Sequence, residues 1–141
     1  MRFPGPRRSA NLGSFYLQNQ PHILYAEDDP DTRELVQLIL GQAGFRVSAT
    51  GDSSEVLDLL ATNPFDALLL DNWMPKIDGI ELCRMIRSLD HKLPIFFCSG
   101  AATEADKMIA LSAGAQGYFV KPFDPDELTA TLRTALKIQQ S

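Results

Sequence analysis

Acidic, hydroxyl and ammonium side chains follow four separate apolar runs of the sequence, each at the point where the run stops. In chain order these side chains are Glu27, Asp28, Asp71, Ser99 and Lys121. Clustered carboxylates repel one another and need a cation, and oxygen ligands without paired thiols or imidazoles favour Mg²⁺ or Mn²⁺. A hydroxyl and an ammonium group beside such an ion would stabilise phosphoryl oxygens. These residue types therefore predict phosphoryl-transfer chemistry, provided that the fold brings the segments together.

Asp71 is the acidic residue that is hardest to explain without a functional role. It follows three consecutive leucines, and a carboxylate at the end of a buried strand is costly without a charged partner. Other acids have ordinary explanations. Asp29 is expected to cap the start of a helix rather than bind metal, and Asp78-Gly79 is expected to form a turn and a helix cap.

Short apolar runs alternate with helical patterns from residue 22 onward. The runs predict strands over 22–26, 45–49, 67–70, 94–98 and 116–120. The helical patterns predict helices over 31–43, 52–60, 79–89, 103–113 and 124–138. Strict alternation predicts a single doubly wound α/β domain, (βα)5, with a five-stranded parallel sheet. Because ligands bind outside the carboxyl ends of such strands, the chemistry-bearing residues are expected to share one edge of the sheet.

Composition and charge exclude several classes of function. The 141 residues are 45% hydrophobic and carry a net charge of −5. The hydrophobic content argues for one compact domain, and the negative charge argues against a protein that binds the phosphate backbone of nucleic acids. No apolar run approaches the roughly 20 residues that cross a bilayer, and no secretory signal is evident. Cys83 and Cys98 lack metal spacing and are expected to be buried thiols in a reducing compartment. We therefore expect a cytoplasmic domain without direct nucleic-acid or membrane partners.

The first part of the chain differs in composition from the rest. Residues 1–20 are rich in Pro, Gly, Ser and Asn and are expected to form a flexible extension, with the domain over 21–141. An alternative is an arm that docks on a partner through Phe3, Phe15 and Tyr16.

Four motifs at predicted strand ends resemble those of the bacterial two-component response-regulator receiver domain. They are Tyr25-Ala26-Glu27-Asp28-Asp29-Pro30-Asp31, Leu70-Asp71-Asn72-Trp73-Met74-Pro75 with Asp78-Gly79, Cys98-Ser99-Gly100, and Tyr118-Phe119-Val120-Lys121-Pro122-Phe123. The resemblance covers about residues 22–138. It implies a CheY-like fold with strand order 2-1-3-4-5. It also implies a phosphoacceptor signalling domain rather than an enzyme, which assists its own phosphorylation and its slow autodephosphorylation.

The resemblance implies roles for the acidic residues. Asp71 would be the nucleophile that accepts a phosphoryl group from a sensor histidine kinase or a phosphotransfer protein. Mg²⁺ or Mn²⁺ would be bound by Asp71 and Asp28, by the backbone carbonyl of Trp73 and, mainly through water, by Glu27. Glu27 replaces the commoner Asp, a variation that receivers tolerate. The Trp73 side chain is expected to overhang the phosphoryl group and slow its hydrolysis.

The resemblance also implies a switch. Ser99 and Lys121 would bind phosphoryl oxygens, and Tyr118 would turn inward when Ser99 shifts. The Lys121-Pro122 peptide bond is expected to be cis. The face formed by the fourth and fifth helices and the last strand would then change its affinity for a downstream protein or for a second copy in a homodimer. The kinase is expected to dock near the first helix.

Two other interpretations remain open. A haloacid-dehalogenase-like phosphatase also uses a nucleophilic Asp, but it needs a second Asp two residues later, where this chain has Trp73. A binding scaffold that works without phosphorylation is the other, although the complete set of polar groups favours chemistry. Because the chain stops soon after the last predicted helix, we expect a stand-alone receiver. A phosphorelay shuttle or a piece of a larger regulator or hybrid kinase is the alternative.

Overall fold

A five-stranded parallel sheet forms the centre of the computed structural model, which describes residues 20–100 and 103–136. The strands are β1 (His22–Ala26), β2 (Arg46–Thr50), β3 (Ala67–Asp71), β4 (Ile95–Ser99) and β5 (Gly117–Val120). Their order is β2-β1-β3-β4-β5 with every neighbouring pair parallel, which confirms the predicted topology. The expected extension over 1–20 lies outside the described residues except for its last residue.

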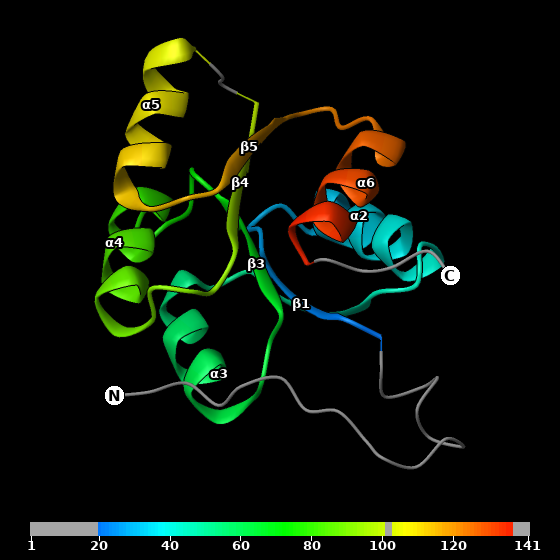
Figure 1. Ribbon diagram of the computed structural model, residues 1–141, viewed down its shortest axis with the longest axis horizontal. Coiled ribbons are helices and arrows are strands. Elements are labelled where there is room, and N and C mark those ends of the chain that lie inside the picture. Colours follow the sequence, from blue (N-terminus) through cyan, green and yellow to red (C-terminus); the bar gives the residue numbers. More distant parts are fainter. Residues whose placement is uncertain (1–19, 101–102, 137–141) are drawn as a thin grey trace.

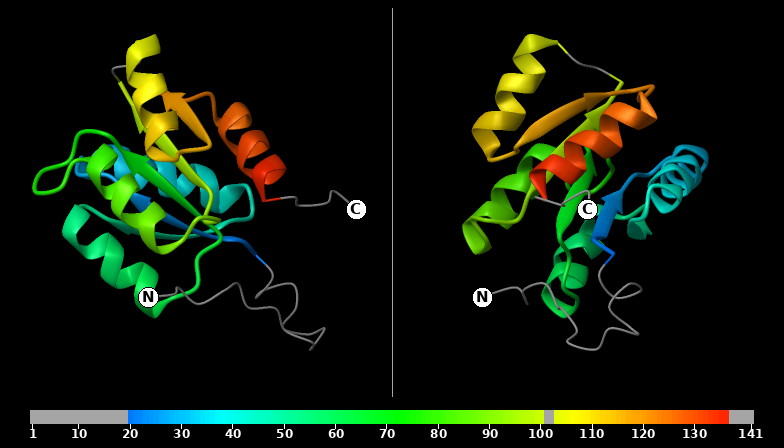
Figure 2. Two further views of the ribbon diagram at one scale, coloured as in Figure 1. Left: turned by 60° about the vertical axis from the view of Figure 1, so that its left-hand side comes forward. Right: turned by 45° about the vertical axis from the view of Figure 1, so that its right-hand side comes forward.

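Helices cover both faces of the sheet, as Figures 1 and 2 show. They are α2 (Pro30–Gln42), α3 (Val56–Thr62), α4 (Gly79–Leu89), α5 (Glu104–Ala113) and α6 (Pro125–Ala135), with a short 3₁₀ turn, η1 (Ser53–Glu55), before α3. One core cluster joins the sheet to α3, α4 and α5, and the other joins it to α2 and α6. We refer to these two faces as the α4/α5 face and the α2/α6 face.

Local sequence signals explain where most helices begin and end. The side chain of Asp29 accepts a hydrogen bond from the Thr32 backbone nitrogen at 2.9 Å, and Asp78 accepts one from that of Glu81 at 2.9 Å. Both carboxylates therefore cap helices, as predicted. Gly114 ends α5 in a left-handed conformation with φ 115°, which glycine adopts without strain.

The predicted helix over 52–60 is wrong in its first turn and stops short of the observed end at Thr62. The first turn is the 3₁₀ segment η1, and the α-helix begins only at Val56. The buried Ser53 hydroxyl donates to the Pro75 carbonyl at 2.8 Å and accepts from the Ile77 nitrogen at 3.1 Å. This contact ties the turn to the loop after β3, and a sequence pattern cannot reveal such a long-range contact.

The last predicted helix, over 124–138, is shorter at both ends. Asp124 is the N-cap of α6, and the helix ends at Ala135 with Leu136 as its C-cap. Residues 137 and 138 lie outside the described residues.

Side chains alternate between the two faces along each strand. In β1, Ile23 and Tyr25 belong to the α2/α6 cluster, whereas Leu24 and Ala26 belong to the α4/α5 cluster. Every residue of β3 and β4 is buried, as expected for central parallel strands. The same alternation decides on which side of the sheet edge each polar residue projects.

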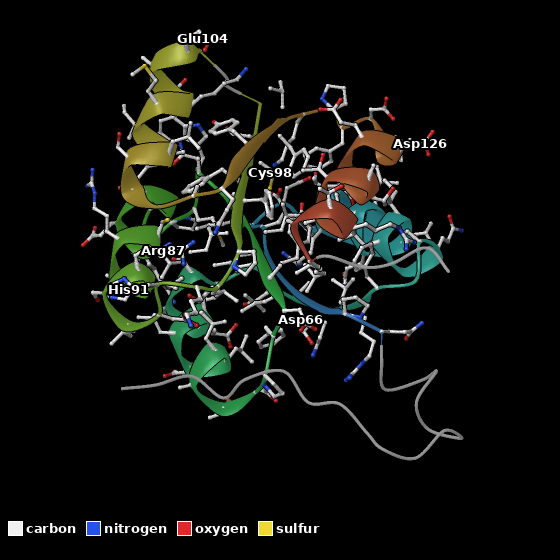
Figure 3. The ribbon with its side chains drawn as sticks, in the orientation of Figure 1. Asp66, Arg87, His91, Cys98, Glu104 and Asp126 are labelled. Carbon is white, nitrogen blue, oxygen red and sulfur yellow. The ribbon has the colours of Figure 1, made fainter. Side chains whose placement is uncertain are left out.

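Both cysteines are free thiols buried in this core. Cys98, labelled beside β4 in Figure 3, belongs to the α2/α6 cluster and Cys83 to the α4/α5 cluster. Burial raises the pKa of both thiols. Separately, no helix within 20–100 or 103–136 has the length and apolar character needed to span a membrane.

Candidate functional site

Three carboxylates meet at the carboxyl end of the neighbouring strands β1 and β3. Glu27 and Asp28 directly follow β1, and Asp71 is the last residue of β3. One oxygen from each of the three lies within 4.8 Å of the others. Glu27 and Asp71 are buried and Asp28 is exposed. Oxygen donors with one open side fit a hard divalent cation that keeps water and phosphate ligands.

Lys121 follows β5 and supplies the cation nearest to these carboxylates. Its Nζ pairs with Glu27 Oε1 and lies 3.4 Å from Asp71 Oδ2. Its backbone nitrogen donates to the Ser99 carbonyl at 2.9 Å, and the Lys121-Pro122 bond is cis as expected. Glu27, Asp71 and Lys121 continue the alternation of the α2/α6 face, and we call them the charged side of the site.

Electrostatics within the charged side set unequal proton affinities. Burial, followed by hydrogen bonding with Glu27, raises the pKa of Asp71 to about 7. Burial also acts to raise the pKa of Glu27, but its hydrogen bonds with Asp71 and Lys121 and the Lys121 charge outweigh burial and lower it. Glu27 therefore ionises more readily than Asp71.

The groups that hold Glu27 were not predicted from the sequence. The Tyr25 hydroxyl donates to Glu27 Oε1 at 3.0 Å, and the Asp29 backbone nitrogen donates to Glu27 Oε2 at 3.2 Å. Tyr25 and Glu27 lie two residues apart, so they project from the same face of the sheet. That spacing was the available signal in the sequence.

Arg33 on α2 was also not predicted as part of the site, although it holds the loop that carries Glu27 and Asp28. Its Nη1 donates to the Glu27 carbonyl at 2.7 Å and to the Asp28 carbonyl at 3.5 Å. A Cβ at Gly51 would lie 2.7 Å from the same Nη1. The glycine after β2 therefore leaves the space that the guanidinium occupies.

Ser99 and Tyr118 lie on the opposite side of the sheet edge, continuing the α4/α5 face. Ser99 is buried, and the Tyr118 ring stacks on Phe97 with 6.1 Å between centroids. Burial raises the pKa of Tyr118, and side-chain hydrogen bonding with Ser99 and Asn72 opposes that rise. Both residues carry an uncharged hydroxyl group on this side of the sheet edge. We call these two residues the neutral side of the site.

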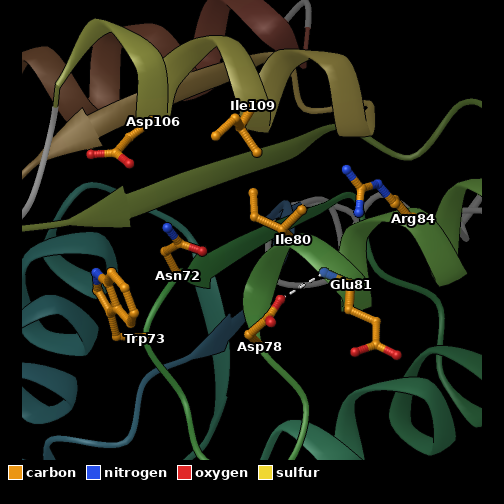
Figure 4. Close-up of a pocket in the computed structure, with 8 residues that line it drawn as sticks. All are labelled: Asn72, Trp73, Asp78, Ile80, Glu81, Arg84, Asp106 and Ile109. Carbon is orange, nitrogen blue, oxygen red and sulfur yellow. Dashed lines mark hydrogen bonds between the residues drawn. The ribbon is translucent and has the colours of Figure 1, made fainter.

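The loop after β3 connects the two sides. The Trp73 backbone nitrogen donates to Asp71 Oδ1 at 3.1 Å, while the Trp73 side chain is 66% exposed. This side chain lines a groove between α4 and α5, drawn in Figure 4, together with Asn72, Asp78, Ile80, Glu81, Arg84, Asp106 and Ile109. A Cβ at Gly79 would lie 2.8 Å from the Asp71 carbonyl, so only glycine lets α4 begin this close to Asp71.

The structure thus brings the predicted residues of the site to one edge of the sheet. Lys121 contacts both Glu27 and Asp71, and Asp28 lies within ligand distance of the same two carboxylates. The Trp73 backbone carbonyl as a metal ligand stays a prediction.

Comparison with known proteins identifies the family. Residues 23–133 match the family model of the response regulator receiver domain. The chain is 39% identical over 115 residues to the response regulator MprA of Mycobacterium sp. (strain KMS), covering 82% of this chain and 50% of that protein. It is also 39% identical over 121 residues to the transcriptional regulatory protein CseB of Streptomyces avermitilis, covering 86% of this chain and 51% of that protein. The chain therefore spans about half the length of these relatives.

Solved structures show the same fold. The receiver domain of the Francisella response regulator 1452 superposes with a TM-score of 0.80 at 29% identity, over 84% of this chain and 98% of that one. The receiver domain of the sensor histidine kinase PA1611 of Pseudomonas aeruginosa superposes with a TM-score of 0.78 at 28% identity, over 84% of this chain and 98% of that one. That structure has a magnesium ion coordinated in its active site cleft. The chain belongs to the response regulator receiver domain family of two-component systems.

Proposed function

We propose that this chain accepts a phosphoryl group on Asp71 and thereby switches its affinity for a partner protein. One observation carries the proposal. Asp71 is buried at the end of a central strand, within ligand distance of two further carboxylates and beside the Lys121 ammonium. A scaffold that never reacts has no need for this costly arrangement of buried charge.

The proposed reaction is an in-line displacement at phosphorus. An Asp71 oxygen attacks, the bond from phosphorus to the donor's imidazole nitrogen breaks, and that nitrogen keeps the electron pair and takes up a proton. The product on this chain is an acyl phosphate, which water slowly hydrolyses back to the carboxylate. Lys121 and the Ser99 hydroxyl bind the oxygens of the transferred group, where negative charge accumulates.

Glu27, Asp28, Asp71 and the Trp73 backbone carbonyl would hold Mg²⁺ or Mn²⁺. The donor set supports this, because three carboxylate oxygens cluster without imidazole or thiolate. Such an ion neutralises charge on the phosphoryl oxygens. The buried Glu27 is fixed by donors of its own chain, so it is suited to accepting hydrogen bonds from metal-bound water.

Response regulator receiver domains interact with histidine kinases or phosphotransfer proteins. Leu35 and Leu38 on α2 are both exposed, which supports docking of the phosphodonor on that helix beside the site. Met108, Leu111 and Val120 leave apolar surface exposed on α5 and β5. We propose that the face formed by α5, β5 and α6 contacts a downstream protein or a second copy of the chain.

Phosphorylation by acetyl phosphate with Mg²⁺, read by intact mass, tests the proposal. The wild type is expected to gain one phosphoryl group and Asp71→Asn none. Asp58→Asn on α3, an exposed acid outside the site, is the matched control and is expected to behave like the wild type. An adduct on both the wild type and Asp71→Asn, or on neither, would refute the assignment.

A further inference from the structure

We propose that Tyr25 is a positioning residue of this site. Its hydroxyl holds the Glu27 carboxylate in the place where it pairs with Lys121 and takes part in binding the metal. The inference rests on the proposed function, because it concerns the same site. Tyr25 is not proposed to touch the phosphoryl group or the attacking oxygen. Its role is exerted through Glu27.

Both partners of this contact are fully enclosed by the protein. Tyr25 is 0% exposed and Glu27 is 1% exposed, and 3.0 Å separates the phenol oxygen from Glu27 Oε1. Lys121 Nζ pairs with that same carboxylate oxygen. Oε1 thus receives one donor from β1 and one from the residue after β5, while Oε2 receives the Asp29 N–H.

Glutamate needs such a restraint more than aspartate would. Its extra methylene adds a rotatable bond, so the carboxylate can occupy several places unless its oxygens are held. A buried tyrosine suits the task because its ring has few torsions and packs among apolar neighbours, while its hydroxyl reaches the polar edge. Hydrogen bonds to a carboxylate are also stronger than neutral ones.

The surroundings of Tyr25 argue that its hydroxyl is present for Glu27. Its direct partners on the neighbouring strands are Ala49 and Leu69, which offer no polar side chain. Phenylalanine would fill the same volume without a polar atom. The competing explanation is structural: a buried hydroxyl needs any acceptor, and Glu27 happens to supply one. The two explanations differ in whether loss of the hydroxyl weakens metal binding.

A double-mutant cycle separates them. Mg²⁺ affinity is measured by calorimetric titration for the wild type, Tyr25→Phe, Glu27→Asp and the double variant. Tyr25→Phe is expected to raise the Mg²⁺ Kd about three- to tenfold, at or just below the smallest effects typical of groups that orient metal ligands. In the Glu27→Asp background the same change is expected to have no effect, because the shorter carboxylate cannot reach the phenol.

The kinetic readout should follow the same pattern. With acetyl phosphate at low Mg²⁺, Tyr25→Phe is expected to be phosphorylated more slowly by the factor found for Kd, and saturating Mg²⁺ should restore the rate. Ser48→Ala is the matched control. It removes a hydroxyl that bonds to His22 Nε2 at 2.7 Å, away from the site, and should lower stability to urea without changing the Mg²⁺ Kd.

Two results would overturn the inference. One is an unchanged Mg²⁺ Kd in Tyr25→Phe, even if urea unfolds the variant more easily, because the role would then be structural. The other is an equal change of Kd in both Glu27 backgrounds, because the effect would then not pass through Glu27. Absence of an adduct on wild-type Asp71 would instead refute the proposed function, and the Mg²⁺ titrations would still decide the role of Tyr25.

Discussion

The charged side and the neutral side of the site are held by different forces. On the charged side, Lys121 links two buried carboxylates, and Tyr25 fixes one of them. On the neutral side, Ser99 and Tyr118 carry uncharged hydroxyl groups, and the Tyr118 ring stacks on Phe97. Charges in a poorly solvated site interact strongly and are costly to separate. Neutral hydroxyl contacts contribute much less each.

This difference suggests a division of labour. We propose that the charged side is arranged for the metal and the phosphoryl group before either binds, which favours reaction. The neutral side is the part that can rearrange at low cost when a group carrying about −1.5 to −2 charges is added. The loop from Asp71 to Gly79 lies between the two, because Asp71 belongs to the charged side and Asn72 is a neighbour of Tyr118.

The largest expected effect comes from removing the only cation that this structure places between Glu27 and Asp71. Lys121→Gln leaves two buried carboxylates without their ion pair and is expected to lower the free energy of unfolding by about 3–5 kcal/mol in EDTA at pH 8. Ser99→Ala, the corresponding change on the neutral side, should lower it by about 1 kcal/mol. Urea unfolding measures both.

Mg²⁺ provides the control for that pair of variants. If charge repulsion is the cause, saturating Mg²⁺ should recover part of the stability lost by Lys121→Gln and little of that lost by Ser99→Ala. Equal losses in the two variants, or no recovery with Mg²⁺, would contradict the division into a charged and a neutral side.

The pH dependence of stability tests the charged side alone. The folded-state pKa of Asp71 is raised to about 7 from the ordinary 3.8. The folded protein therefore binds a proton that the unfolded chain has released, and the stability this proton contributes is lost as the pH rises through about 7. The lowered pKa of Glu27 acts in the opposite direction, as the pH falls below the ordinary range of glutamate.

Asp71→Asn removes this ionisation. In EDTA at pH 8 the variant is expected to be more stable than the wild type by about 2–4 kcal/mol, and at pH 5 the difference should shrink. Urea unfolding at several pH values measures the difference, and adding Mg²⁺ at pH 8 should stabilise the wild type selectively. If the difference in stability between the two proteins does not depend on pH, burial does not destabilise the ionised form of Asp71.

A smaller effect is expected from Trp73, whose side chain we expect to overhang the phosphoryl group. Trp73→Asn removes a large side chain two residues after Asp71 and should admit water to the acyl phosphate. The decay of the phosphorylated protein is expected to be about three- to tenfold faster, equivalent to roughly 1 kcal/mol of barrier. The decay is followed by intact mass after the phosphodonor is removed. Equal decay rates would show that the exposed Trp73 ring does not shield the group.

The comparison also shows what the sequence could predict. Local residue patterns predict the strand ends, the parallel order of the strands and helix caps such as those of Asp29 and Asp78. These features were enough to predict that the reacting groups lie at one edge of the sheet. The hydrogen bonds of Tyr25 and Arg33 to Glu27 were not predicted, because they depend on how the side chains meet in the folded protein. The sequence predicts Tyr25 only as part of an apolar strand, although the alternation of side chains also predicts that it shares a face with Glu27. The 3₁₀ turn η1 depends on the contact between Ser53 and Pro75, 22 residues later.

The smallest expected effect tests how firmly that connecting loop is held. Lys76 lies in it with a left-handed backbone (φ 74°), and its Nζ pairs with Asp52 Oδ2 at 2.8 Å. Lys76→Ala and Lys76→Gly both lose this exposed ion pair, but only glycine adopts the conformation without strain. The glycine variant should therefore melt about 4 °C above the alanine variant, as followed by circular dichroism. Because the pair is exposed, neither variant should change the Mg²⁺ Kd by more than about twofold. Equal melting temperatures would mean that the loop relaxes at residue 76, and a larger change in Kd would mean that this brace belongs to the charged side.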